Sequence, residues 1–199
     1  ADGLTVKSYI DDIKYAVSAD SDKNGNIAVV SDNGQLSIVK NAAVISEYSA
    51  SDGGRYTTCS FDDAGMLYVG TSKGNIDKYE YDLYNNAYVL KESVRCNELN
   101  NIKGIYFVDN TLTENATLFV CADNGIGYYD SQNRFINIDT GSFNNSIDHM
   151  TADYQGNLWF TSSRLGLLRL SRSAFTQLNY EHTDEKLVVN TVTMWNGNY

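Results

Sequence analysis

The two histidines are the side chains of this sequence best suited to acid–base chemistry near neutral pH. His149 is expected at the start of a strand, where an imidazole can contact a ligand or act as a base. A general base needs an orienting carboxylate or a nucleophile, and the adjacent Asp148 points to the opposite face of a strand. His182 is followed by Asp184 and Glu185, which is typical of a solvated loop. We therefore predict that His149 is an exposed or hydrogen-bonded residue and that the chain has no catalytic residue.

Metal and cofactor chemistry has little support in the residue pattern. Residues 20–25 copy the first half of a calcium-binding EF-hand loop, but Ser31 stands where that loop needs a bidentate Glu. The three cysteines, Cys59, Cys96 and Cys121, have no CxxC spacing, and the first and last lie in apolar runs typical of a core. No GxSxG motif, phosphate-binding glycine loop or zinc spacing is present. We expect no metal and no cofactor.

The charge of the chain limits its partners. Its formal net charge is −10, with 15 Lys and Arg against 25 Asp and Glu. Nucleic-acid binding requires clustered basic side chains, and an anionic membrane surface would repel this chain. No segment approaches the length of apolar residues needed to span a bilayer. We predict no nucleic-acid partner and no direct membrane contact.

An internal repeat indicates the elements that position these residues. Asp-x-x-Gly turns precede apolar runs at Gly25, Gly65 and Gly156, and a comparable run covers residues 116–121. A second glycine follows each run, at Gly34, Gly74, Gly125 and Gly166, with intervals of 40, 51 and 41 residues. A period near 40 with four strands in each unit is typical of a β-propeller. A barrel or sandwich, the competing all-β architecture, does not need this period.

The strand pattern supports the same fold. The second strand of each repeat (27–29, 67–69, 118–120 and 158–160) is apolar on both faces, as a blade between two neighbours requires. In the fourth repeat, 147–153 is the expected inner strand, followed by 157–161, 166–170 and the outer strand 175–180; Trp159 is expected in the core between blades. We predict a single all-β domain, a partial β-propeller of about four complete four-stranded antiparallel blades. The repeats cover approximately 10–50, 54–95, 99–140 and 144–182, with an incomplete repeat at 186–199.

Residues 153–169 (DYQGNLWFTSSRLGLLR) resemble the two-component regulator propeller repeat, which has an Asp, a Gly-x-Leu-Trp run, a Gly-Thr and a Gly-Leu close to an Arg. Gly70 and Thr71 supply the Gly-Thr pair in the second repeat, whereas Thr161 replaces the usual Gly. The resemblance implies an extracellular or periplasmic sensor domain of a membrane-anchored histidine kinase or diguanylate cyclase. The repeats also resemble streptogramin-lyase propellers, which use a channel His, a nearby acid and a divalent cation. Such an enzyme is the alternative function, and a structural scaffold is a third.

The fold predicts where a ligand would bind. Loops that lead into the inner strands, and loops between second and third strands, gather on one face around the channel. The residues that they contribute are polar and neutral or basic, which suits a saccharide, another polar metabolite or a protein: Arg55, Asn100, Asn101, Asn145, Ser146, His149, Arg164 and Asn190. We predict a non-catalytic ligand- or protein-binding module of a bacterial signalling protein.

The two ends of the sequence repeat parts of a blade. Residues 4–9 match the expected outer strand 175–180, and residues 188–195 match the inner strand of the fourth repeat. We expect apolar blade faces to remain uncovered at the first and last repeats, and open edges invite pairing with another chain. A homodimer through these edges is predicted ahead of self-closure by a makeshift fifth blade.

Overall fold

The computed structural model describes residues 9–108 and 116–171. The regular secondary structure of these residues consists of β-strands alone. The strands form four consecutive antiparallel sheets, so the predicted all-β class is confirmed. The first two sheets contain β1 (Ala16–Ser21), β2 (Ile27–Ser31), β3 (Leu36–Lys40) and β4 (Ala43–Tyr48), then β5 (Tyr56–Phe61), β6 (Leu67–Thr71), β7 (Asn75–Asp82) and β8 (Ala87–Arg95). The last two contain β9 (Ile102–Tyr106), β10 (Ala116–Ala122), β11 (Gly125–Asp130) and β12 (Phe135–Ile138), then β13 (Ile147–Ala152), β14 (Leu158–Ser162) and β15 (Gly166–Leu170).

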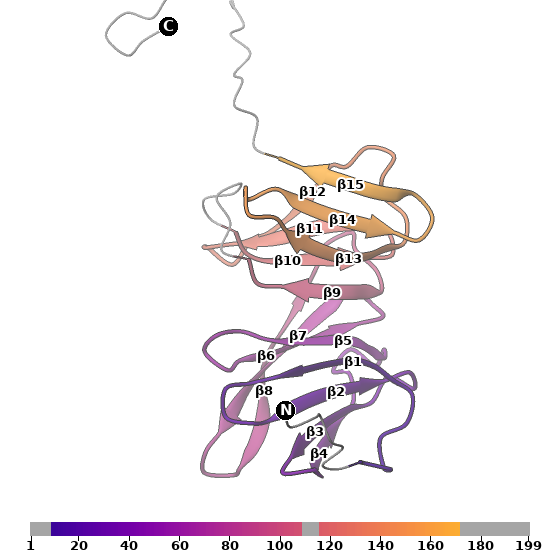
Figure 1. Cartoon of the computed structure of the whole chain (residues 1–199). Helices are drawn as coiled ribbons and strands as arrows, with labels where there is room; N and C mark the ends of the chain where they lie inside the picture. Colours follow the sequence, from indigo (N-terminus) through magenta and orange to yellow (C-terminus); the bar gives the residue numbers. More distant parts are fainter. Residues whose placement is uncertain (1–8, 109–115, 172–199) are drawn as a thin grey trace, which may run out of the picture.

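Each sheet is a meander in which strands adjacent in sequence are adjacent in space, as in a propeller blade. The four blades follow one another in chain order, with the first at the bottom of Figure 1 and the fourth at the top. Their inner strands β1, β5, β9 and β13 contact one another in that order. The predicted β-propeller fold is confirmed. Strands β13 to β15 lie where the sequence placed them, and the expected outer strand 175–180 lies outside the described residues.

The core lies between the blades. Three separate clusters of buried side chains fill the three spaces between consecutive blades. Strand β6 contributes to two of them, because Leu67 and Val69 face the first blade while Tyr68 faces the third. Strand β10 does the same with Leu118 on one side and Phe119 on the other. In the second and third blades, the apolar residues on both faces of the second strand therefore pack against two neighbouring blades.

The Asp-x-x-Gly hairpins form as the sequence indicates. Gly25, Gly65 and Gly156 have φ values of 78°, 86° and 82°, in the left-handed region that favours glycine. One carboxylate oxygen of Asp153 accepts hydrogen bonds from the backbone N–H groups of Gln155 and Asn157, each at 2.9 Å. The aspartates of the first and second blades bind their own turns in the same way. Each hairpin thus satisfies its backbone locally.

Trp159 departs from its expected place in the core. The indole is half-buried, its N–H donates to Asp153 Oδ2 at 2.9 Å, and the guanidinium of Arg169 lies 5.7 Å from the ring centre. Tyr68 holds the same position in the second blade, where Phe107 of the third blade packs against it with ring centres 5.0 Å apart. Within residues 9–108 and 116–171, no strand lies beyond the fourth blade, so none of these residues covers Trp159 as Phe107 covers Tyr68.

Candidate functional site

The loops at one rim of the propeller bind each blade to the next. In each case, a backbone carbonyl in the loop between the second and third strands of one blade accepts a hydrogen bond from the next blade. The donor is a backbone N–H at the start of that blade's inner strand or immediately before it. The N–H groups of Tyr56, Asn101 and Ser146 donate to the carbonyls of Gly34 (3.2 Å), Ser72 (3.1 Å) and Asp123 (2.6 Å). The two kinds of loop named by the sequence therefore meet at this rim.

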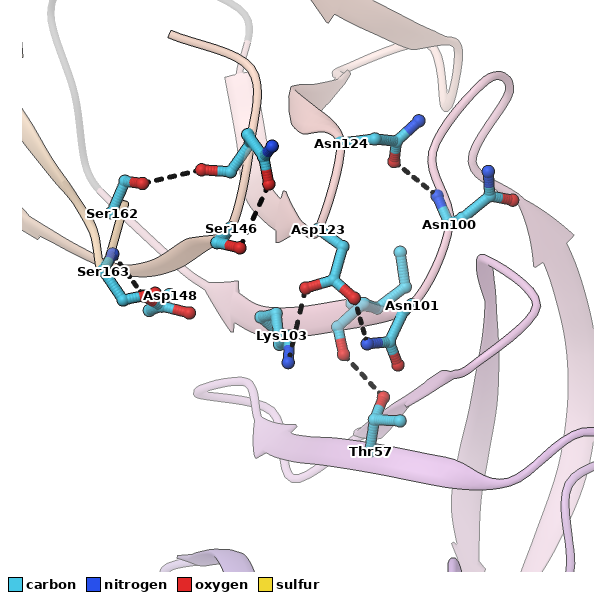
Figure 2. Close-up of polar contacts among 12 residues, drawn as sticks. Thr57, Asn100, Asn101, Lys103, Asp123, Asn124, Ser146, Asp148, Ser162 and Ser163 are labelled. Carbon is cyan, nitrogen blue, oxygen red and sulfur yellow. Dashed lines mark hydrogen bonds and ion pairs between the residues drawn. The ribbon is translucent and has the colours of Figure 1, made fainter. Parts of the chain in front are cut away.

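Several of the predicted site residues use their polar groups to build this rim (Figure 2). The side-chain amide of Asn101 donates to Asp123 Oδ2, and the backbone N–H of Asn100 donates to Asn124 Oδ1 at 2.8 Å. The carbonyl of Asn145 accepts from Ser162 Oγ at 2.6 Å. Asn101 and Ser146 both have a φ of 51°, a left-handed conformation that turns the chain into the inner strand.

The other predicted residues are less closely connected. Arg55 and Arg164 are exposed, and their backbone N–H groups donate to Ser72 Oγ (3.0 Å) and Ser162 Oγ (3.2 Å). Within residues 9–108 and 116–171, neither guanidinium has a hydrogen-bond or ion-pair partner. Asn190 lies outside the described residues. The two arginines therefore remain free at the rim, while the asparagines are structural parts of it.

A cavity of about 460 Å³ lies among the four inner strands, close to this rim. Strand β1 contributes Asp20 to its lining, β5 contributes Thr57, β9 contributes Lys103, and β13 contributes Asp148 and His149. Because all four blades line it, we take this axial cavity as the candidate functional site. Of the residues predicted from sequence, the cavity wall includes His149.

His149 has an open environment within the axial cavity. Its side chain is exposed, and its ring meets Tyr106 edge to face with centres 5.3 Å apart. The neighbouring Asp148 uses Oδ2 to accept the backbone N–H of Ser163 at 2.8 Å. Burial raises the pKa of Tyr106 to about 12, so its phenol stays neutral at physiological pH.

Sequence reasoning missed Lys103 and Asp123. Lys103 Nζ lies 3.3 Å from Asp123 Oδ1, and the side chains are 37% and 43% exposed. Figure 2 shows the pair beside Asn101, whose amide holds the other oxygen of Asp123. The pair joins strand β9 to the loop between β10 and β11, and no sequence spacing links the two positions. The structure alone shows that the register of β9 against β10 shifts beside Lys103, between Cys121 and Ala122.

The calcium-like segment at residues 20–25 has other partners. Asp20 Oδ2 accepts the backbone N–H of Phe61 at 2.7 Å and the hydroxyl of Ser60 at 3.2 Å. Asp22 binds its own turn and accepts the hydroxyl of Tyr88 at 3.1 Å. In the part of the chain that the structure describes, no group of three or more His, Cys, Asp or Glu side chains is placed to hold a metal ion. The same residues include no helix long and apolar enough to cross a membrane.

Comparison with known proteins identifies the fold. No family model and no curated protein sequence matches the chain. Among solved structures, it is similar to the extracellular domain of the hybrid two-component system BT3049 from B. thetaiotaomicron, with a TM-score of 0.57 and 16% identity over 80% of this chain. The match covers 23% of that domain, so this chain spans about a quarter of its length. It is also similar to the computationally designed Ika4 protein, with a TM-score of 0.55 and 10% identity over 83% of this chain and 96% of the designed one.

Proposed function

We propose that this propeller is a non-catalytic sensory module that binds a small polar ligand, such as a saccharide, in the axial cavity. The observation that carries the proposal is a cavity of about 460 Å³ lined by the inner strands of all four blades. Its walls present an ammonium, an imidazole, carboxylates and hydroxyls, which suit hydrogen bonding to a polar molecule. A ligand there touches every blade, so binding changes the contacts of the whole propeller.

The surroundings of His149 favour binding over catalysis. A histidine that acts as a base is usually oriented by a carboxylate on its other ring nitrogen. Asp148 directs one oxygen to the backbone of Ser163, and the described contact of the His149 ring is the edge of Tyr106. An imidazole with two free nitrogens serves well as a donor or acceptor for a ligand hydroxyl.

The sensory role is supported by two kinds of resemblance. Residues 153–169 resemble the two-component regulator propeller repeat, and the fold is similar to the extracellular domain of a two-component system. We therefore propose that the chain is part of the extracellular or periplasmic portion of a membrane-anchored signalling protein. This placement can be tested by expressing the full-length gene product and adding protease to intact cells and to cells with a permeabilised outer membrane. A propeller that is cleaved only after the cytoplasmic membrane is broken would contradict it.

Binding is tested by thermal unfolding of the wild-type chain in the presence of a panel of mono- and disaccharides, each at 10 mM. We expect at least one sugar to raise the Tm of the wild-type chain by several degrees, because a ligand that binds only the folded state stabilises it. His149→Ala should lose most of this shift. The control Tyr84→Ala, at a hairpin tip with 95% exposure, should keep it.

Three results would overturn the proposal. One is a panel without any sugar that shifts the Tm. Another is a shift of equal size in His149→Ala, which would place the ligand elsewhere. The third is chemical conversion of the bound sugar, measured by NMR over a day, because turnover would make the propeller an enzyme.

A further inference from the structure

Most polar side chains that line the axial cavity already have partners within the protein. Ser18 Oγ accepts the backbone N–H of Cys59 at 3.1 Å, and the hydroxyl of Thr57 donates to the carbonyl of Ile102. The carboxylate of Asp20 accepts the N–H of Phe61 and a serine hydroxyl. These bonds join the first blade to the second and the second to the third. A ligand that took over these groups would have to separate the blades.

Three groups keep unused hydrogen-bonding positions. Lys103 Nζ has one described partner, Asp123 Oδ1 at 3.3 Å, and an ammonium carries three N–H donors. His149 has an aromatic contact and no described hydrogen bond. Asp148 directs Oδ2 to Ser163 and leaves Oδ1 without a described partner. The free set is therefore two nitrogen groups and one carboxylate oxygen.

Building on the proposed function, we infer that the ligand carries a carboxylate next to hydroxyl or amino groups, with a uronic acid as a compact example. Lys103 and His149 donate to the ligand carboxylate, and Asp148 Oδ1 accepts from a neighbouring hydroxyl. A charge-assisted hydrogen bond from an ammonium to a carboxylate is shorter and stronger than a neutral one. A neutral sugar of the same shape cannot make this bond, so it binds less tightly.

Negative charge lies both within the cavity and over the surface. Asp20 and Asp148 line the cavity beside Lys103, and each carboxylate accepts a backbone N–H, so binding of an anion requires the direct contact with Lys103 to outweigh them. The net charge of −10 is a property of the whole surface. At physiological salt, charges separated by more than about 8 Å are largely screened. The attraction between the Lys103 ammonium and a ligand carboxylate acts at hydrogen-bond distance, where salt screens it weakly. The net charge therefore slows the approach of an anion more than it weakens the final contact.

Titration calorimetry with two matched pairs of sugars tests the inference: D-glucuronate against D-glucose, and D-galacturonate against D-galactose. Each pair differs at the sixth carbon alone. We expect one uronate to bind at least tenfold more tightly than its neutral partner. Lys103→Met should remove this preference, and Lys103→Arg should retain most of it. Lys91→Met is the matched control, because Lys91 pairs with Glu80 on the second blade and does not line the cavity.

The outcomes separate this inference from the proposed function. Equal binding of a uronate and its neutral partner would overturn the role of Lys103 and leave a saccharide sensor in place. If a neutral sugar from the panel binds and neither uronate does, the role of Lys103 is likewise overturned and the saccharide sensor is retained. A preference that survives Lys103→Met in a folded variant, as judged by circular dichroism, would also refute it. If Lys103→Met does not fold, loss of the preference in His149→Gln decides the matter.

Discussion

The interface between the first two blades and the interface between the last two solve one packing problem with different chemistry. The first contains a buried polar network, in which Tyr56 OH donates to Asp77 Oδ2 at 2.7 Å and is hydrogen bonded to Tyr79 OH at 2.6 Å. The last is filled by apolar side chains such as Phe119, Met150 and Phe160. The network lies on the face that the second blade turns toward the first, and its fixed directions hold β5, β7 and the preceding loop in one arrangement, whereas apolar contacts depend on shape and tolerate adjustment.

The network at the first interface is complete. Asp77 is fully buried and also accepts the N–H and the hydroxyl of Ser51, at 3.0 and 2.7 Å. Burial, reinforced by the bonds to Tyr79 and Asp77, raises the pKa of Tyr56 far above its ordinary value. Its phenol therefore remains a donor at any physiological pH. A buried carboxylate with this many donors avoids most of the cost of desolvation.

The largest expected effect is at the apolar interface. Phe160 is fully buried, and Phe160→Ala should lower the free energy of unfolding by about 3–5 kcal/mol, because it removes a buried ring and leaves a cavity. Urea unfolding followed by fluorescence measures this change. The control Thr161→Ala, at the exposed neighbouring position on β14, should change stability by less than about 0.5 kcal/mol. A cost under about 1 kcal/mol for Phe160→Ala would show that this interface is not close packed.

An intermediate effect distinguishes the two interfaces directly. Tyr56→Phe preserves the ring and removes the hydroxyl, so Asp77 and Tyr79 lose a partner in a buried site. We expect a loss of about 1–3 kcal/mol. The matched change at the last interface, Met150→Leu, retains volume and should cost less than about 1.5 kcal/mol. If the two substitutions have equal small effects in urea unfolding, the polar network does not stabilise the second blade's face of this interface more than apolar packing would.

Among the described residues, no strand packs against the outer face of the fourth blade. Leu167 is 60% exposed and Trp159 is half-buried on this face, and Leu165 in the adjoining turn is 43% exposed. We predict that two copies of the chain associate through such a face, burying more than about 1,000 Å² in total. Light scattering at micromolar concentration should give twice the monomer mass, and Leu167→Asp should return the monomer. A wild-type mass near 22 kDa that is stable on dilution would contradict the dimer.

The smallest expected effect concerns the turn beneath Trp159. Hydrogen bonds from the side chains of Asn157 and Trp159 lower the pKa of Asp153 from 3.8 to about 2. A carboxylate whose pKa is lowered on folding stabilises the protein above its unfolded value, and this stabilisation disappears as pH falls toward the folded value. The Tm of Asp153→Asn should therefore lie below that of the wild type at pH 5 and converge with it near pH 2.

The comparison uses a matched control in the same turn. Tyr154 is 96% exposed, and Tyr154→Phe removes no carboxylate, so the variant should have a Tm profile between pH 5 and pH 2 that is parallel to that of the wild type. A constant offset between Asp153→Asn and the wild type across this range would show that the turn does not depend on the ionised carboxylate.

The strands and turns follow from local rules that the sequence displays. The glycines at Gly25, Gly65 and Gly156 and the apolar pattern of the second strands determine the blades, because both depend on neighbours in sequence. The Lys103–Asp123 pair and the Tyr56–Asp77 bond connect residues about twenty positions apart across loops, and no spacing rule joins them. His149 was identifiable because histidines are rare here. Trp159 is half-buried, as Tyr68 is at the same position of the second blade, and the residues expected beyond Trp159, 175–199, lie outside the described part of the chain.

The contrast between the two ends of each blade bears on how such a chain can grow. Each Asp-x-x-Gly aspartate binds its own turn, and the first of these hairpins also contacts the second blade, because Tyr88 OH donates to Asp22 Oδ2 and Lys23 pairs with Asp63. The loops at the opposite rim hold the next blade through the backbone carbonyls of Gly34, Ser72 and Asp123. The hairpin between β7 and β8 already extends outward, with Leu83 and Tyr84 87% and 95% exposed. We expect a peptide inserted at the exposed tip of the β7–β8 hairpin to leave the blades in register, because exposed hairpin tips tolerate insertions. A peptide inserted at the rim breaks the hydrogen bond to the next blade. This outer hairpin is therefore the place where engineering can lengthen the chain.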